Sequence, residues 1–202
     1  MNLFERIKND KLAISTCIVL VGSIAAKLIQ ALMLHLMTDY YPVSSENMMI
    51  TGLGMLPSVM LLVYVLVFYK SEMPQLLLPG TFVVQLLVSV WSAWTDYMML
   101  GIWNASIVFS NLIWIVYYAF LVFATYKGFE NGTVLKVAIA VMSLYAMLGS
   151  VVTWYTLLRT FPEETVMIVS QAIAIVGYFC YYLATFLIVP KAAEEIYYLP
   201  ER

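Results

Sequence analysis

LAISTCIVLVGSIAAKLIQALMLHLM, residues 12–37, is an apolar run long enough to cross a bilayer as one helix. At about 1.5 Å per residue it would cover roughly 39 Å, compared with roughly 30 Å for the hydrocarbon core of a membrane. Lys27 lies close to the middle of this run, too deep for its ammonium group to reach water easily along the helix. Inserting a lysine at that depth costs about 2.5–3.5 kcal/mol, so we expect Lys27 to face the protein interior or a wet cavity.

The composition extends this interpretation to the whole chain of 202 residues, which is 63% hydrophobic and 11% charged, outside the range of soluble domains. Five further apolar windows follow the first, at residues 48–69, 74–95, 98–126, 133–158 and 165–190. Their connections are too short to hold a soluble domain. The sequence therefore predicts an all-α, polytopic helical bundle of six transmembrane helices, which forms one domain over residues 1–202 and resides in the cell membrane.

The positive charges predict the orientation of this bundle, because lysine and arginine in short connections resist translocation. With six spans, only Arg159 of the ten lysines and arginines falls on the side opposite the termini, and Lys27 falls within the membrane. The remaining eight fall on the side of the termini: Arg6, Lys8, Lys11, Lys70, Lys127, Lys136, Lys191 and Arg202. This bias predicts that the N- and C-termini are both cytoplasmic.

A weak internal repeat relates the last four predicted helices. Sliding the chain by 60 residues aligns SNLIWIVYYAFLVFATY (110–126) with SQAIAIVGYFCYYLATF (170–186) without a gap, and seven of the seventeen positions are identical. The same offset pairs Trp94 with Trp154. The alignment favours a tandem repeat of helical hairpins, spans three and four followed by spans five and six. Apolar composition also produces such matches by chance, so both origins stay open.

Polar residues recur at a spacing of seven in four windows, which returns them to nearly the same face of a helix. The seams are Thr16, Ser23 and Gln30 beside Lys27; Asn104, Asn111, Tyr118 and Thr125; Lys136, Ser143 and Ser150; and Gln171, Tyr178 and Thr185. Lipid cannot satisfy these groups, so we expect the seams to converge inside the bundle. The candidate solute-binding residues are Lys27, Gln30, Asn104, Asn111, Tyr118, Gln171 and Tyr178. Plain interhelical hydrogen bonding explains the serines and threonines equally well.

Lys27 has no acidic partner within any predicted span. Three arrangements would resolve this: the side chain is neutral, its charge awaits an anionic ligand, or Asp39 or Asp96 reaches inward from the outer interface. Pro57, two residues after a Gly-rich turn in the second window, predicts a kink that would assist such a rearrangement. Broken helices mark binding sites in transporters, although tolerated kinks are commoner.

Several function classes are disfavoured. The net charge of −2 provides no basic surface for nucleic acid, and the two cysteines lie inside apolar windows, where they read as small buried hydrophobes. The sequence contains no HExxH, no GxSxG and no pair of intramembrane carboxylates, so we expect no enzymatic activity, catalytic residues, metal or cofactor.

The leading hypothesis is a membrane protein that binds or transports a small polar, anionic solute, with Lys27 as the counter-charge. Active transport would require an ion gradient or a motor or membrane subunit, since the chain carries no nucleotide-binding motif. The alternative is a non-transporting assembly, immunity or regulatory subunit that acts through a protein partner in the lipid bilayer.

Overall fold

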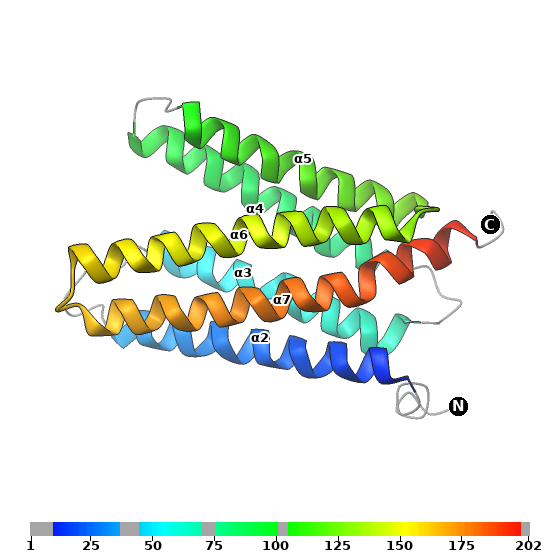
Figure 1. The fold of residues 1–202 in the computed structure, drawn as a ribbon, viewed down its shortest axis with the longest axis horizontal. Helices are drawn as coiled ribbons and strands as arrows, with labels where there is room; N and C mark the ends of the chain where they lie inside the picture. The colour runs from blue at the N-terminus through cyan, green and yellow to red at the C-terminus, as the bar shows by residue number, and fades with distance from the viewer. Residues whose placement is uncertain (1–9, 37–44, 70–75, 101–104, 199–202) are drawn as a thin grey trace.

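The computed structural model of the protein describes residues 10–36, 45–69, 76–100 and 105–198, and within these ranges every regular element is helical (Figure 1). In chain order the elements are α2 (Lys11–Leu36), α3 (Ser45–Val63), the π-helical turn η1 (Tyr64–Phe68), α4 (Leu77–Leu100), α5 (Ala105–Lys127), α6 (Gly132–Thr160) and α7 (Thr165–Tyr197). The prediction of an all-α protein is confirmed. The start of α2 and the end of α7 lie at the same end of the bundle (Figure 1).

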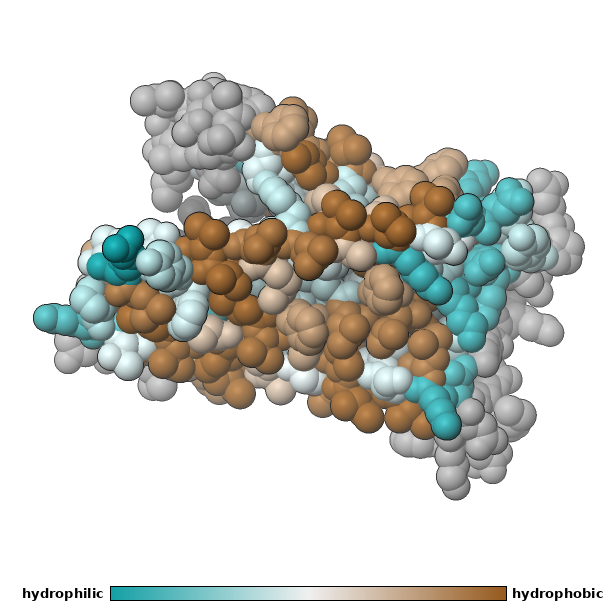
Figure 2. Space-filling view, in the orientation of Figure 1, coloured by the Kyte–Doolittle hydropathy of each residue, from teal (hydrophilic) through white to brown (hydrophobic). Residues whose placement is uncertain are grey.

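Five of these helices, α2, α4, α5, α6 and α7, are long and apolar enough to cross a membrane. In α3 and η1 the apolar part is shorter, Leu53–Val67. Figure 2 shows apolar side chains over the middle of the bundle and hydrophilic ones at its two ends. Large apolar side chains such as Leu144 and Leu148 of α6 are exposed by 64% and 66%, which suits contact with lipid rather than water. The chain is built as a multi-pass membrane protein.

Five helices form a closed ring, because α2 contacts α3, α3 contacts α4, α4 contacts α5, α5 contacts α7, and α7 contacts α2. Helix α6 lies outside this ring and packs chiefly against α7 (Figure 1). It also touches α5, where the hydroxyls of Ser110 and Tyr145 are 3.1 Å apart. The ring is therefore built from helices distant in sequence, and its centre is the place where interior polar groups can meet.

The predicted polar seam of residues 133–158 does not reach the centre of the bundle, so this part of the prediction is wrong. Lys136 is exposed, and the hydroxyls of Ser143 and Ser150 donate to the carbonyl oxygens of Ile139 and Ala146 within α6 itself. A hydroxyl that bonds to its own helix needs no partner from another helix. The other three seams point inward in part: Thr16, Ser23, Tyr118, Thr125 and Thr185 are buried, whereas Asn111 and Gln171 are partly exposed and Tyr178 is 39% exposed.

Helices α2 and α7 approach each other most closely at Gly177. A Cβ atom added there would lie 3.2 Å from the Cβ of Ala26 and 3.5 Å from the Cγ of Lys27. The hydroxyl of Ser23 donates to the carbonyl oxygen of Gly177 across this contact, at 2.9 Å. Small residues that let two backbones approach are typical of packing between membrane helices. This contact holds Lys27 against α7.

The end of α7 is held by the turn between α5 and α6. Helix α7 continues through Pro190 to Tyr197, beyond the apolar window that ends at residue 190. The backbone N–H of Phe129 donates to the carbonyl oxygen of Ala193 at 2.9 Å. Gly128 has φ +80°, and a Cβ there would lie 2.4 Å from the backbone nitrogen of Tyr197, so the close contact requires glycine.

The positions related by the 60-residue offset have matching surroundings in α5 and α7. Ala124 and Ala184 are both fully buried. Thr125 and Thr185 are buried as well, and each donates to the carbonyl oxygen four residues earlier in its own helix. The preceding helices differ, because α4 belongs to the ring and α6 lies outside it. The tandem hairpin repeat therefore stays a prediction, now supported by one of its two helices.

Replacing Gly177 by leucine should destabilise the bundle, because the new side chain would be forced between α2 and α7. Overpacking of this kind costs about 1–3 kcal/mol, and we expect a clearly lower midpoint of thermal unfolding in detergent. Gly149→Leu is the matched control, since a Cβ at Gly149 meets nothing within 4 Å, and it should leave the midpoint almost unchanged. Equal midpoints for the two variants would contradict the close α2–α7 contact.

Candidate functional site

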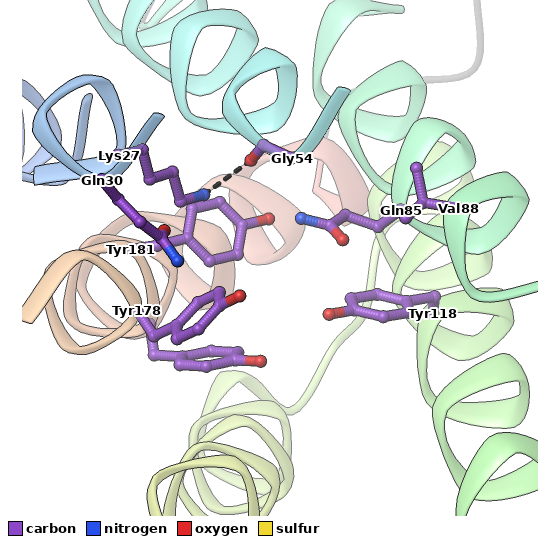
Figure 3. Close-up of a pocket in the computed structure, with 9 residues that line it drawn as sticks. Lys27, Gln30, Gly54, Gln85, Val88, Tyr118, Tyr178 and Tyr181 are labelled. Carbon is purple, nitrogen blue, oxygen red and sulfur yellow. Dashed lines mark hydrogen bonds between the residues drawn. The ribbon is translucent and has the colours of Figure 1, made fainter. Parts of the chain in front are cut away.

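A cavity of about 210 Å³ lies inside the helix ring, with room for about seven water molecules at roughly 30 Å³ each. Every helix of the ring contributes to its wall, and α6 does not. The lining residues are Lys27, Gln30, Gly54, Gln85, Val88, Tyr118, Tyr178, Tyr181 and Tyr182 (Figure 3). Among these residues none is acidic, and Lys27 is the one basic side chain. The cavity is thus a polar, aromatic chamber with a single cationic group.

The ammonium group of Lys27 has several uncharged partners. Its Nζ donates to the carbonyl oxygen of Gly54 at 2.6 Å and to Oγ of Ser58 at 3.3 Å. It also lies 5.1 Å from the ring centroid of Tyr181 and 5.9 Å from that of Tyr178. Aromatic faces stabilise a nearby cation by about 0.5–2 kcal/mol each. The carbonyl and hydroxyl dipoles and the two aromatic rings therefore stabilise the ammonium group, in place of the carboxylate that would be expected beside a buried lysine.

The proline of α3 loosens the turn that contains Gly54. Pro57 has no backbone N–H to donate to the carbonyl oxygen of Leu53, four residues earlier, and its ring crowds the preceding turn. Gly54 lies in this loosened turn and has no side chain to cover its carbonyl group. In membranes, backbone groups near a helical proline are satisfied by neighbouring helices. Here the neighbour is α2, through Lys27.

A directed chain of hydrogen bonds continues from Lys27 into the α2–α7 contact. Oγ of Ser58 lies 3.2 Å from Oγ of Ser23, and Ser23 donates to the carbonyl oxygen of Gly177. Since a serine hydroxyl has one proton, Ser23 must accept the proton of Ser58, which in turn accepts from Lys27. The chain fastens α2, α3 and α7 together behind the ammonium group.

The wall opposite Lys27 is formed by α4 and α5. Gln85 and Tyr118 point from it into the cavity, toward the side of α2 and α7 (Figure 3). Trp114 stacks on Tyr118 with ring centroids 5.7 Å apart, which restricts the orientation of that tyrosine. The hydroxyl of Tyr181 points toward the amide of Gln85 and, within the described ranges, has no hydrogen-bond partner of normal geometry. The ring of Tyr181 thus lies against the ammonium group of Lys27, and its hydroxyl extends toward the wall formed by α4 and α5.

The structure brings together four of the seven candidate solute-binding residues, Lys27, Gln30, Tyr118 and Tyr178, around this cavity. Asn111 and Gln171 are partly exposed and do not line it. Each lies seven residues before a lining tyrosine, about 10 Å along its helix toward the end where α5 and α7 begin. Asn104 lies outside the described residues.

Sequence reasoning missed Gln85, Tyr181, Tyr182 and Gly54. Gln85 gave a usable signal, because an amide within an apolar window is costly unless it faces the interior. The two tyrosines stand in the run YFCYYLATF (178–186), where aromatic residues also fit ordinary helix packing. Gly54 takes part through its backbone, which no pattern of side chains reveals.

The structure does not test the two acidic residues considered as partners of Lys27. Asp39 lies outside the described residues, and the side chain of Asp96 is likewise not described. Asp96 belongs to the last turns of α4, eleven residues beyond Gln85, which is about 16 Å further along the helix. The ranges with described side chains hold no cluster of three histidine, cysteine or acidic residues that could bind a metal ion. Cys17 and Cys180 are free and partly buried.

No protein-family model, curated protein or solved structure matches this chain. The functional conclusion therefore rests on the geometry and chemistry of the cavity.

If the cavity is wet, a cysteine that replaces Gln85 should react with a charged methanethiosulfonate reagent, because the thiolate that reacts forms only in contact with water. The variant is made in a background with Cys17→Ala and Cys180→Ala, and the reaction is followed by mass. Leu87→Cys is the control, since Leu87 of α4 is 63% exposed on the outer surface and should react far more slowly. Equally slow reaction at both positions would show that the cavity is dry.

Proposed function

We propose that this protein binds a small, polar, anionic solute in the cavity of the helix ring and transports it across the membrane. The observation that carries the proposal is the single lysine in a mid-bundle cavity whose described lining residues include two glutamines, four tyrosines and no acidic residue. An anion entering this space would meet an unneutralised positive charge. Intramembrane charges of this kind are costly and usually serve a ligand or ion pathway.

Packing alone accounts poorly for this arrangement. Helices that need only to associate in lipid do so through small residues and isolated hydrogen bonds, and the Ser23–Ser58 contact already supplies these. The amides of Gln30 and Gln85 line the cavity, and the buried hydroxyl of Tyr181 has no hydrogen bond of good geometry within the described part of the chain. Buried polar groups without partners cost about 1–3 kcal/mol each, which a bound polar solute would offset.

Transport requires a path and a movable element, and the bundle offers candidates for both. Asn111 of α5 and Gln171 of α7 are related by the 60-residue offset. Both lie between the cavity and the end of the bundle where α5 and α7 begin, and they would line a path toward that end. Helix α3 contains Pro57 and is followed by the π-helical turn η1, and such interruptions frequently occur at functional sites and moving segments. Energy would come from an ion gradient or from a motor or membrane subunit.

The alternative function is a non-transporting assembly, immunity or regulatory subunit. Helix α6 favours it, because its position outside the ring leaves most of its length open to lipid or to a protein partner. In that case the Lys27 chain would only fasten α2, α3 and α7. The two functions differ in what happens when Lys27 is replaced: a solute site loses its ligand, whereas a packing site loses stability.

We also propose six membrane spans, with both termini cytoplasmic and the protein in the cell membrane. α3 and η1 run on from Ser45 to Phe68, about 35 Å of helix, which is enough to cross the hydrocarbon core as a sixth span. An even number of spans agrees with the start of α2 and the end of α7 lying together (Figure 1).

Reporter fusions test this topology. Green fluorescent protein fused after Arg202 should fluoresce, and alkaline phosphatase at the same position should be inactive, because each reporter matures on only one side of the membrane. Alkaline phosphatase fused after Pro162, between α6 and α7, should be active. The reverse pattern would contradict a cytoplasmic C-terminus, and equal activity at both fusion points would contradict a membrane crossing by α7.

A thermal-unfolding panel in detergent tests solute binding directly. A ligand that binds only the folded protein stabilises it by about 2.7 kcal/mol at 100 times its dissociation constant, so a matching anionic or zwitterionic metabolite should raise the unfolding midpoint. Lys27→Met should abolish the shift while the variant remains folded. Lys136→Met removes an exposed lysine of α6 and should respond like the wild type.

Gly54→Leu provides a second variant that keeps Lys27 in place. A Cβ at Gly54 meets nothing within 4 Å and Gly54 lines the cavity, so leucine should occupy the solute space without disturbing the fold. No shift with any compound, together with a Lys27→Met variant that unfolds at a lower temperature, would contradict solute binding and favour the partner-subunit function.

A further inference from the structure

We propose that the cavity selects a monocarboxylate of lactate size that carries a further hydroxyl or carbonyl oxygen. This inference rests on the proposed solute-binding function and specifies its ligand class. It follows from three properties of the cavity. These are its single charged residue, the one N–H of the Lys27 ammonium group that is left for a ligand, and the polar side chains on the opposite wall.

The charge of the lining selects a single negative charge. Lys27 is the one charged residue among the described residues that line the cavity. A monoanion would neutralise it, whereas a second negative charge would remain uncompensated in a medium of low dielectric constant. A neutral solute would gain nothing from the ammonium group beyond an ordinary hydrogen bond. Dicarboxylates, phosphate esters and neutral polyols are therefore disfavoured.

The ammonium group has one hydrogen left for a ligand. Two of its three N–H groups point to Gly54 and Ser58, and the rings of Tyr178 and Tyr181 flank the nitrogen. A carboxylate oxygen can take the remaining hydrogen and gain the stronger, charge-assisted bond. The existing partners hold Nζ in place, so the anion meets a preorganised cation instead of a flexible side chain.

The far wall selects a second oxygen on the ligand. Tyr181 extends its buried hydroxyl to the amide of Gln85 without a hydrogen bond of good geometry, and Tyr118 points into the cavity from the same side (Figure 3). A carboxylate with an apolar tail would leave the hydroxyl of Tyr181 with only this poorly aligned contact, whereas a hydroxyl or carbonyl oxygen on the ligand would bond to it. The volume of about 210 Å³, close to that of seven water molecules, suits a ligand with a similar number of non-hydrogen atoms.

Four probes of similar size separate these requirements: lactate, propionate, succinate and glycerol, each titrated against the full-length protein in detergent by its thermal unfolding. Lactate should bind most tightly. Propionate lacks the hydroxyl and should bind about three- to tenfold more weakly, the loss expected for one hydrogen bond. Succinate and glycerol should produce no shift at the concentrations that saturate lactate.

Tyr181→Phe isolates the far wall, because it keeps the ring beneath Lys27 and removes the hydroxyl. The preference for lactate over propionate should fall toward one, with propionate binding unchanged. Tyr126→Phe changes an exposed tyrosine of α5 and should keep the full preference. A Tyr181→Phe variant that discriminates like the wild type would overturn the role assigned to this hydroxyl.

The remaining outcomes separate this inference from the proposed function. If succinate or glycerol binds as tightly as lactate, and Gly54→Leu abolishes that binding, the cavity is a solute site and the monocarboxylate selectivity is wrong. If none of the four probes binds, the selectivity is also wrong, and the wider metabolite panel then decides the proposed function. Lactate binding that persists in both Lys27→Met and Gly54→Leu would place the ligand elsewhere and overturn both.

Discussion

The hydrogen bond from the ammonium group of Lys27 to the carbonyl oxygen of Gly54 is the interaction around which this bundle is arranged. A cation at the middle of a membrane helix needs partners that lipid cannot provide. The loosened turn of α3 before Pro57 offers one, Ser58 offers a second, and two tyrosine faces of α7 complete the surroundings. Helices α3 and α7 must therefore both meet α2 at the depth of Lys27, and this requirement brings three helices of the ring together.

The close contact at Gly177 and the open space beyond Lys27 are two sides of the same arrangement. On one side, Ala26 and Gly177 bring α2 and α7 together without room for another methyl group. On the other, α4 and α5 stand back and leave a cavity of about 210 Å³. The structure places its small residues where helices must touch and its amides and hydroxyls where they do not. Stability and binding thus depend on different faces of the same helix.

The residue pattern predicts the helices better than the site, for physical reasons. An apolar run longer than a bilayer leaves few alternatives to a membrane helix, and the buried seam of α2, with Thr16, Ser23 and Lys27, follows from the cost of polar groups in lipid. The same rule fails for α6, because a hydroxyl bonded to its own helix can lie inside, as that of Thr125 does, or outside the ring, as that of Ser143 does. Nothing in an apolar sequence shows which helix stands outside a ring. Gln85 and Tyr181 reach the cavity through packing between α4 and α7 that spacing along one helix does not encode.

The hydrogen-bond chain behind Lys27 also limits where its ammonium group could lose a proton. It runs from Lys27 through Ser58 and Ser23 and ends on the carbonyl oxygen of Gly177, a group too weakly basic to hold a proton or pass one on. That route offers the ammonium group no proton acceptor, so a proton of Lys27 would have to exchange with water through a wet cavity. A solute that fills the cavity would close this exit. The occupied and empty proteins would then differ in whether Lys27 can exchange a proton with water. Solute binding would in this way be coupled to the protonation of Lys27.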